Sequence, residues 1–176
     1  FYGGLEKSDE DLYDENINRI YTSYLPNIGY EIFEEKIRVY LEKLPKKTFS
    51  PSQFLFELGR VMEGECLLSI AFEKNIPIFC PCIGDSVLGF HAWMYSQGKN
   101  PILNPLLDQK GILDIVWGEK KIGALIVGGG VPKHYLAMAA QMSGKGLSYA
   151  IQITLDRPEH GGVSGAPLRE AISWGK

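Results

Sequence analysis

The sequence is poor in the residues that build disulfide scaffolds and membrane anchors. Its 176 residues include three cysteines and three histidines. So small and odd a cysteine count argues against a disulfide framework and suits a reducing compartment. No apolar run approaches the roughly 20 residues that a helix needs to cross a bilayer, and residues 1–15 are acidic, unlike a signal peptide. We therefore expect a cytoplasmic protein that does not enter a membrane.

Neither sign of charge is in large excess. Lys and Arg total 18, Asp and Glu total 21, and the formal net charge is −3. This balance gives no electrostatic reason to expect nucleic acid as a direct partner. Hydrophobic residues make up 45% and charged residues 22% of the chain, as in an ordinary globular protein. Because there is no internal repeat or low-complexity linker, we expect residues 1–176 to form a single α/β domain.

The spacing of a metal site is also missing. CPC (80–82) brings two cysteines together, but only Cys66 and three scattered histidines remain to complete a ligand set. Structural zinc sites pair their ligands at short, regular intervals. We expect no bound metal, and we interpret Cys80 and Cys82 as buried thiols at the end of a strand.

Helical patterns dominate the first half of the chain. Residues 1–16 are interpreted as a polar arm or loop, whereas 28–44 repeat apolar residues at helical spacing and keep a charged outer face. Ser50 followed by Pro51 predicts the start of a second helix over 50–62. Residues 63–75 predict a third helix that ends near Asn75.

Short apolar runs then alternate with helices. We expect strands in IPIFCP (76–81), IGALIV (122–127) and LSYAIQIT (147–154). The helices expected between and after them cover 84–98, 104–121 with an interruption near Gly111, 132–142 and 168–174. This alternation predicts an α/β fold with a Rossmann-like, mainly parallel sheet and helices on both faces. Three strands are few for such a sheet, so further strands are either missed here or absent from this chain.

The carboxyl ends of these strands are where such a sheet binds ligands. The glycines of GGGVPKH (128–134) allow a close backbone approach, and the following helix points free N–H groups and its positive dipole end at the same place. A tight strand-to-helix turn explains the same glycines without a ligand. His134 lies in the first turn of that helix, where the dipole favours a neutral imidazole that can accept a proton or an ammonium group. A histidine merely exposed at a helix start is the alternative.

Two further stretches carry candidate ligand groups. Asp85, after the first predicted strand, either caps the next helix or binds a ribose or an amine. In EAISWGK (170–176), Gly175 is expected to end a helix and leave Lys176 just beyond it. A lysine with a lowered pKa forms imines, and Glu170 and Trp174, four residues apart, offer a carboxylate and a ring face for a cation. These residues suit a polyamine pocket, whereas a solvent-exposed terminal lysine is the plainer alternative.

Five segments together resemble the deoxyhypusine synthase family, and they occur in the family's order from Asn16 to Lys176. They are NINRIYTSYLPNIGYEIFEE, NIPIFCPCIGDSVLG, GGGVPKHY, YAIQIT and SGAPLREAISWGK. The combination of GGGVPKH with SWGK is very specific, and DRPEHGGVSGA is similar to the archaeal and bacterial branch. The resemblance implies an NAD-dependent transferase of hypusine biosynthesis. Such an enzyme oxidises spermidine and passes its aminobutyl group, through an enzyme lysine imine, to a lysine of the hypusine-containing translation factor precursor.

The resemblance also implies roles for individual residues. Lys176 would be the covalent catalyst, and His134 would help to bind and deprotonate the amine. The positions implied for spermidine binding are Glu170, Trp174, His134, Gly161 and Gly162. The positions implied for NAD binding are Asp85, Gly129, Gly130, Thr154, Leu155 and Ser164.

Three positions depart from the family pattern. Phe90 and Val163 stand where many members have acidic residues near the amine, and Met138 stands where eukaryotic members have a polar residue. The loss of carboxylates leaves the amine donor and acceptor open. A homospermidine synthase-like enzyme, another NAD-dependent aminobutyl transferase to a small amine, and a non-catalytic regulatory paralogue remain alternatives.

Members of the family are longer at both ends. They form homotetramers, as dimers of dimers, with active sites between two subunits. The resemblance therefore implies that residues 1–176 are a fragment of a longer chain and that the complete protein forms such a tetramer.

Overall fold

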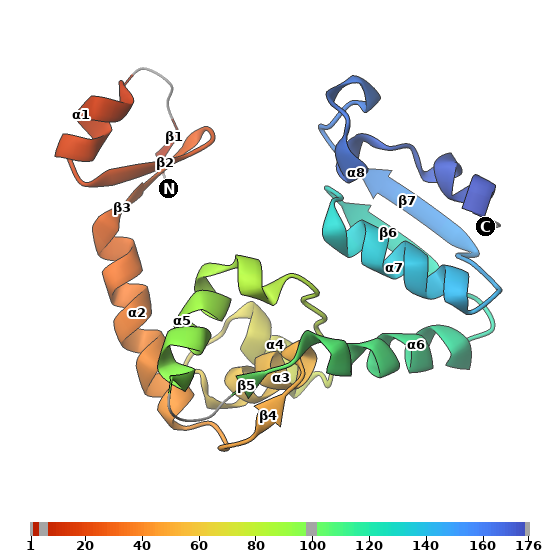
Figure 1. Ribbon diagram of the computed structural model, residues 1–176, viewed down its shortest axis with the longest axis horizontal. Helices are drawn as coiled ribbons and strands as arrows, with labels where there is room; N and C mark the ends of the chain where they lie inside the picture. The colour runs from red at the N-terminus through yellow and green to blue at the C-terminus, as the bar shows by residue number, and fades with distance from the viewer. Residues whose placement is uncertain (1, 4–6, 98–101, 175–176) are drawn as a thin grey trace.

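The computed structural model describes residues 2–3, 7–97 and 102–174. Its helices (α), strands (β) and short 3₁₀ helices (η) are, in chain order, β1 (Tyr2–Gly3), α1 (Asp9–Asp14), β2 (Ile17–Ile20), β3 (Ser23–Pro26), α2 (Asn27–Glu42), β4 (Thr48–Phe49), α3 (Pro51–Val61), α4 (Leu67–Glu73), η1 (Ile83–Asp85), α5 (Val87–Ser96), β5 (Ile102–Leu103), η2 (Pro105–Leu107), α6 (Asp108–Gly118), β6 (Gly123–Val127), α7 (Val131–Met142), β7 (Tyr149–Ile153), η3 (Pro158–His160), α8 (Gly162–Gly165) and η4 (Leu168–Trp174). The arrangement is open, with the N-terminal hairpin and the β6–η4 part at opposite ends and α2–α6 between them (Figure 1).

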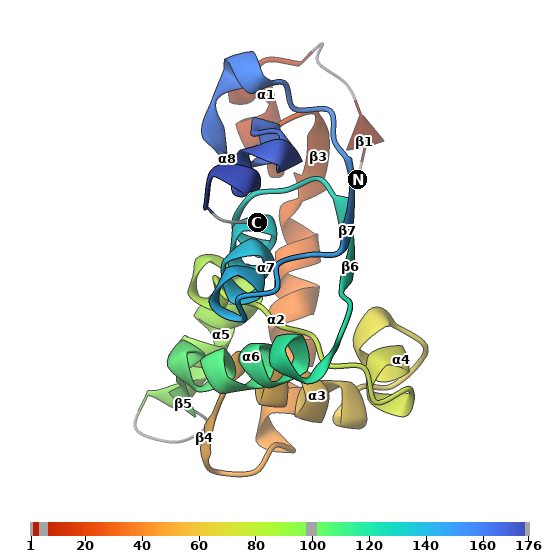
Figure 2. The ribbon, with the colours of Figure 1, turned by 90° about the vertical axis from the view of Figure 1, so that its right-hand side faces the viewer.

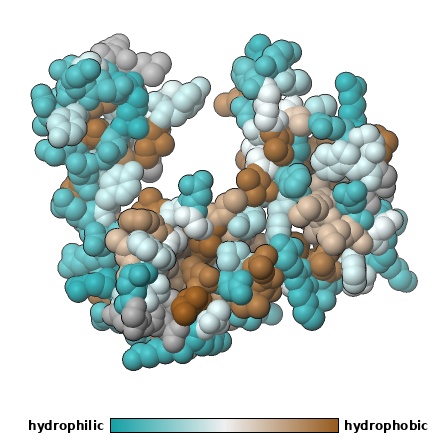
Figure 3. Space-filling model, in the orientation of Figure 1, coloured by the Kyte–Doolittle hydropathy of each residue, from teal (hydrophilic) through white to brown (hydrophobic). Residues whose placement is uncertain are grey.

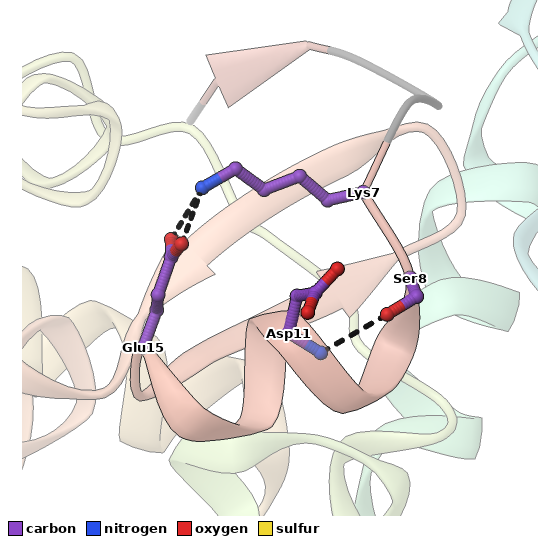
Figure 4. A network of polar contacts seen from close by, with 4 residues as sticks. All are labelled: Lys7, Ser8, Asp11 and Glu15. Atoms are coloured by element: carbon purple, nitrogen blue, oxygen red, sulfur yellow. Dashed lines mark hydrogen bonds and ion pairs between the residues drawn. The ribbon is translucent and has the colours of Figure 1, made fainter.

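The N-terminal residues are more ordered than the polar arm or loop that the sequence predicted. The Ser8 hydroxyl caps α1 by accepting a hydrogen bond from Asp11 N at 3.1 Å. Lys7 and Glu15 flank this helix and form an ion pair, with Lys7 Nζ 2.6 Å from Glu15 Oε1 (Figure 4). Capping and pairing therefore give a short helix to a segment without an apolar pattern.

The antiparallel hairpin of β2 and β3 was not predicted. Its register runs from Ile17↔Pro26 to Ile20↔Ser23, and β1 adds to the other edge of β3. The two-residue turn between the strands contains Tyr21 at φ 55°. Asn-Gly and Asp-Gly are the usual signals of such turns, and this turn contains neither.

One apolar cluster holds the middle of the molecule together. Phe49 and Phe54 are completely buried, and their ring centroids lie 6.4 Å apart. Around them are Leu44, just after α2, and residues of α2, α3, η1 and α5: Ile37, Leu41, Leu55, Leu58, Ile83 and Ala92. The helices predicted over 28–44, 50–62 and 63–75 are confirmed as α2, α3 and α4. Ser50 caps the start of α3 and Pro51 opens the helix, as predicted. Gln53 completes a capping box with Ser50.

Helix α6 runs unbroken through Gly111, where an interruption was predicted. A Cβ at this position would lie 3.3 Å from the Phe79 ring, so the glycine serves close packing and not a break. The start of α6 is joined to the start of α3 through Asp108, which is 4% exposed. Its carboxylate accepts hydrogen bonds from Ser52 N at 2.9 Å and Ser52 Oγ at 2.5 Å.

The C-terminal part contains the two strongest strand predictions, and both are confirmed. β6 and β7 pair in parallel from Gly123↔Tyr149 to Val127↔Ile153, and α7 crosses between them. A second apolar cluster joins α6 to α7 through Ile112, Val116, Tyr135, Ala139 and Ala140. Burial, and secondarily the charge of Asp108, raises the pKa of Tyr135. Since the buried apolar residues form two clusters, the single domain over 1–176 stays a prediction.

The strand predicted over IPIFCP is wrong. Residues 76–80 have no strand partner within the described part of the chain. Ile78 and Cys80 contact the cluster in the middle, and Phe79 contacts the α6–α7 cluster. Residues 78–80 of the apolar run are therefore partly buried against helices, whereas Ile76 is exposed, and the periodicity of so short a segment does not distinguish this packing from burial in a sheet.

A mixed α/β fold is present, but the described residues do not form one Rossmann-like sheet with helices on both faces. Their strands fall into the sheets β1-β3-β2, β4-β5 and β6-β7, of which the last two are parallel. Helix α7 lies beside one face of β6-β7 (Figure 2). On the other face apolar side chains are 61% to 78% exposed: Leu125, Val127, Tyr149, Ile151 and Ile153.

Apolar side chains also reach the surface in the middle of the molecule, between its two ends (Figure 3). On α5, Phe90 is 54% and Trp93 is 58% exposed, and their ring centroids lie 5.7 Å apart. Parallel sheets usually bury both faces, so the open face of β6-β7 and the α5 aromatics are surfaces at which further protein would bury apolar area.

We predict that Asp108→Ala lowers the free energy of unfolding by about 2–3 kcal/mol, because it leaves two donors on Ser52 without their buried carboxylate partner. Urea denaturation followed by circular dichroism measures the change. Asp114→Ala is the matched control in the same helix. Since Asp114 forms an exposed ion pair with Lys110, its loss should cost less than about 0.5 kcal/mol. Equal effects of the two substitutions would contradict the role given to Asp108.

Candidate functional site

The turn after β6 is shaped by glycines that no other residue type replaces easily. Gly128 has φ 83° and Gly130 has φ 72°, in the region that side chains with a Cβ rarely adopt. Gly130 is the N-cap of α7 and supplies no side-chain cap, and Pro132 lies in the first turn as predicted. The turn therefore places the start of α7, which carries His134, directly after the carboxyl end of β6.

Gly129 fulfils the expected close backbone approach, but its neighbour is another part of the chain. A Cβ at this position would lie 2.6 Å from Ser164 Cα and 3.2 Å from Gln152 Nε2. No real Cβ approaches so closely. Residues 161–174, named the strap below, therefore pass directly over the glycine turn.

Two polar residues that the sequence analysis missed join the strap to the sheet. Lys133 Nζ donates hydrogen bonds to Gln152 Oε1 at 3.1 Å, to Val163 O at 3.0 Å and to Ala166 O. Gln152 Nε2 donates to Gly128 O at 2.8 Å and to Ser164 O at 2.9 Å. A glutamine within the apolar strand YAIQIT was the sequence signal for such a network.

The far end of the strap is joined to the same helix. Gln141, one residue before the end of α7, donates a hydrogen bond from Nε2 to Trp174 O at 3.1 Å. The helix predicted over 168–174 is the 3₁₀ helix η4. Residues 155–167 between β7 and η4, predicted as a loop, contain the short helices η3 and α8. The strap thus runs along α7 from Lys133 to Gln141.

A cavity of about 490 Å³ lies between the strap, α7 and the inner face of β6-β7. Apolar residues, five of them alanines, form most of its wall, which suits a ligand with an alkyl chain. The lining residues are Ile126, Lys133, His134, Ala137, Ala140, Leu147, Ala150, Gly162, Val163, Ala166, Pro167, Leu168, Arg169, Glu170, Ala171, Ile172 and Trp174.

Four of the residues predicted to bind the amine line this one cavity: His134, Gly162, Glu170 and Trp174. The His134 and Trp174 rings meet edge to face, with centroids 6.3 Å apart. Gly161 does not line the cavity itself but directly precedes Gly162, which does, and it has φ 70°. Gly175 and Lys176 lie outside the described residues, so their predicted roles as C-cap and catalyst stay predictions.

The positions predicted for NAD fall into three places. Gly129, Gly130 and Ser164 meet at the glycine turn, and Thr154 and Leu155 follow the end of β7, where Leu155 is fully exposed. Asp85 lies in η1, in the middle part of the molecule. It does not cap the next helix, because Ser86 does: its hydroxyl accepts a hydrogen bond from Gly89 N at 3.0 Å.

The three departures from the family pattern lie in different environments. Val163 lines the cavity and adds an apolar wall. Phe90 lies on α5 among aromatic rings, 6.3 Å from His91 and 5.7 Å from Trp93 by ring centroids. Met138 lies on α7, where it is 37% exposed.

The cysteines do not form the pair of buried thiols that was predicted. Cys66 and Cys80 are partly buried, but Cys82 is exposed. Burial raises the pKa of Cys80, and the backbone N–H of Ser69 lowers the pKa of Cys66. Among residues 2–3, 7–97 and 102–174, no three His, Cys, Asp or Glu side chains gather as metal ligands. No helix in the same residues is long and apolar enough to span a bilayer.

Fold and cavity define a mixed α/β protein with a ligand cavity beside a strand-to-helix glycine turn. The family model "DS: Deoxyhypusine synthase" matches residues 1–176. The chain belongs to the deoxyhypusine synthase family, as its motifs predicted.

Archaeal relatives agree with this assignment. The chain is 39% identical over 170 residues to "Probable deoxyhypusine synthase 1" of Methanosarcina mazei, which covers 96% of the chain and 54% of the relative. It is 40% identical over 174 residues to "Probable deoxyhypusine synthase" of Methanopyrus kandleri, covering 99% and 58%. It is 38% identical over 175 residues to "Probable deoxyhypusine synthase 1" of Archaeoglobus fulgidus, covering 99% and 57%. The chain therefore spans little more than half the length of these relatives.

We predict that Gly129→Ala displaces the strap, because the new methyl group would overlap Ser164. The expected loss of stability is about 1–3 kcal/mol, and trypsin should cleave after Arg169, within the strap, faster than in the unchanged protein. Thermal unfolding and timed proteolysis measure both effects. At Gly118 a Cβ would meet nothing within 4 Å, so Gly118→Ala is the control. If both variants are cleaved at the same rate as the unchanged protein, the close approach is not a constraint.

Proposed function

We propose that this protein catalyses the aminobutyl transfer of hypusine biosynthesis. Its donor is spermidine, and its acceptor is a lysine of the hypusine-containing translation factor precursor. The reaction is a group transfer through an imine on Lys176. Family membership supports the reaction class. The observation that carries the proposal is that His134, Glu170 and Trp174 line one cavity. Glu170 and Trp174 also lie just before Lys176 in the chain.

The chemistry of the cavity supports a polyamine ligand. The Glu170 carboxylate pairs with an ammonium group, and the Trp174 ring covers an alkyl chain or a cation. The imidazole of His134 accepts a proton from the amine. The apolar wall of Ala137, Ala140 and Ile172 suits methylene groups and keeps water from the reacting carbon. Once the donor amine is oxidised to an imine, the free Lys176 amine attacks the imine carbon, forms a C–N bond and expels the rest of the donor as an amine. The acceptor lysine then displaces Lys176 from its imine, and return of the hydride reduces the product.

NAD is the proposed cofactor. The glycine turn suits its phosphates, because Gly128 and Gly130 keep the backbone free of side chains and the α7 N-terminus has no side-chain cap. Gly129 and Ser164 would border the cofactor there, with Thr154 and Leu155 at the neighbouring strand end. Asp85 is proposed as a ribose partner. When bound, NAD supplies the hydride acceptor that turns an amine into an imine.

The chain's departures bear on which amine is used. Val163 gives the cavity an apolar wall where many family members have an acid. A donor with fewer ammonium groups than spermidine, or a small amine as acceptor, fits this wall better. Transfer to a small amine, as in a homospermidine synthase-like enzyme, is therefore the second candidate, and a non-catalytic regulatory paralogue is the third.

Assembly into a homotetramer, as a dimer of dimers in the cytoplasm, is part of the proposal. The exposed apolar face of β6-β7 and the exposed Phe90 and Trp93 on α5 support it. Such surfaces gain stability when further protein covers them. We expect residues 1–176 alone to be inactive.

In the protein at its full natural length, Lys176→Ala should lower aminobutyl transfer by on the order of 10³-fold or more, because the covalent route is lost. Binding of NAD should remain. Glu170→Gln should raise the KM for spermidine about tenfold by removing the charged partner of the ammonium. Radiolabelled spermidine and the purified precursor report transfer, and putrescine as acceptor tests the second candidate.

The matched control is Glu159→Gln, since Glu159 lies in η3 and does not line the cavity. It should leave kcat and KM unchanged. Full transfer activity in Lys176→Ala would rule out the imine route. No transfer to the precursor by the unchanged protein, together with transfer to putrescine, would replace the first candidate by the second.

A further inference from the structure

We propose that Lys133 and Gln152 are positioning residues: they clamp the strap over the cavity and thereby hold Glu170 and Trp174 in place for the amine. The clamp itself rests on contacts of the described residues. Its effect on the reaction rests on the proposed function.

Lys133 uses its whole hydrogen-bonding capacity in this clamp. An ammonium group has three donors, and those of Lys133 go to Gln152 Oε1, Val163 O and Ala166 O. Although Lys133 lines the cavity, its charge is directed at backbone carbonyls and not at a ligand. This separates its role from that of Lys176, which is proposed to react.

Gln152 extends the clamp from the helix to the sheet. Its Oε1 accepts from Lys133, and its Nε2 donates both to Gly128 O, in the glycine turn, and to Ser164 O, in the strap. The amide therefore joins β7, the turn after β6 and the strap in one network. Satisfied networks of this kind fix a single arrangement, whereas partial loss leaves unpaired polar groups.

Three of the clamp's acceptors lie directly before η4. The carbonyls of Val163, Ser164 and Ala166 precede Leu168, where η4 begins, so their position sets where the helix starts. Gln141 holds the other end through Trp174 O. Glu170 lies between these two attachments and reaches the cavity from η4. Release of the first attachment would allow its carboxylate to move relative to His134 on the fixed helix α7.

The test compares two lysines that make the same kind of contact in the protein at full natural length. Lys145 Nζ donates to Trp117 O at 3.0 Å and Glu119 O at 3.1 Å, at the C-terminal end of α6, and does not line the cavity. Lys133→Met removes the clamp, and Lys145→Met is the matched control. Gln152→Glu is a second variant that keeps an acceptor for Lys133 but removes both donors. Lys133→Arg is the conservative variant.

The rate of hydrogen–deuterium exchange in peptides within 161–174 reports on the clamp independently of catalytic activity. We expect exchange there to rise about tenfold in Lys133→Met and Gln152→Glu, to stay unchanged in Lys145→Met, and to return largely to normal in Lys133→Arg, which restores several donors. Equal exchange in Lys133→Met and Lys145→Met would overturn the proposal.

Kinetics with spermidine then separate positioning from general stability. The proposal expects Lys133→Met to raise KM about tenfold and to lower kcat, because the ammonium partner and the reacting groups lose their alignment, with partial rescue in Lys133→Arg. Faster exchange with unchanged kinetics would overturn the positioning role. If the unchanged protein transfers no aminobutyl group, the proposed function fails, and spermidine affinity measured by calorimetry takes the place of KM. Affinity that is equal in Lys133→Met and Lys145→Met would again overturn positioning.

Discussion

The cavity depends on how closely two stretches of backbone can approach each other. Gly129 has no side chain, and a Cβ there would lie 2.6 Å from Ser164 Cα. Because the approach is possible, the strap passes low enough over the turn for Lys133 and Gln152 to reach its carbonyls. The strap then closes one side of the cavity and brings Glu170 and Trp174 opposite His134.

The sequence was most informative where one local signal decides the outcome. Ser50 and Pro51 predicted the start of α3, because capping depends on neighbours in the chain. The apolar run before GGG predicted β6, and Pro132 predicted the start of α7. The family resemblance predicted that His134, Glu170 and Trp174 share a pocket, although His134 precedes the other two by 36 and 40 residues in the chain.

The predictions failed where tertiary contacts decide. IPIFCP packs its residues 78–80 against two helix clusters and forms no strand in the described part of the chain. Gly111 allows Phe79 to pack and does not break α6. The β2–β3 hairpin has a turn without Asn or Gly. The cap considered for Asp85 fails for a local reason, because the next residue, Ser86, caps α5. Lys133 and Gln152 were missed because most of their partners are backbone carbonyls distant in the chain; the one sequence signal was a glutamine within an apolar strand.

The central claim is that the cavity holds an amine beside Lys176 and that this lysine reacts with it. The most direct measurement incubates the full-length protein with NAD and spermidine, reduces the mixture with borohydride, and maps added mass by peptide mass spectrometry. The account predicts one aminobutyl group on Lys176, with Lys133 unmodified. An adduct on Lys133, or no adduct although NAD is bound, would contradict it.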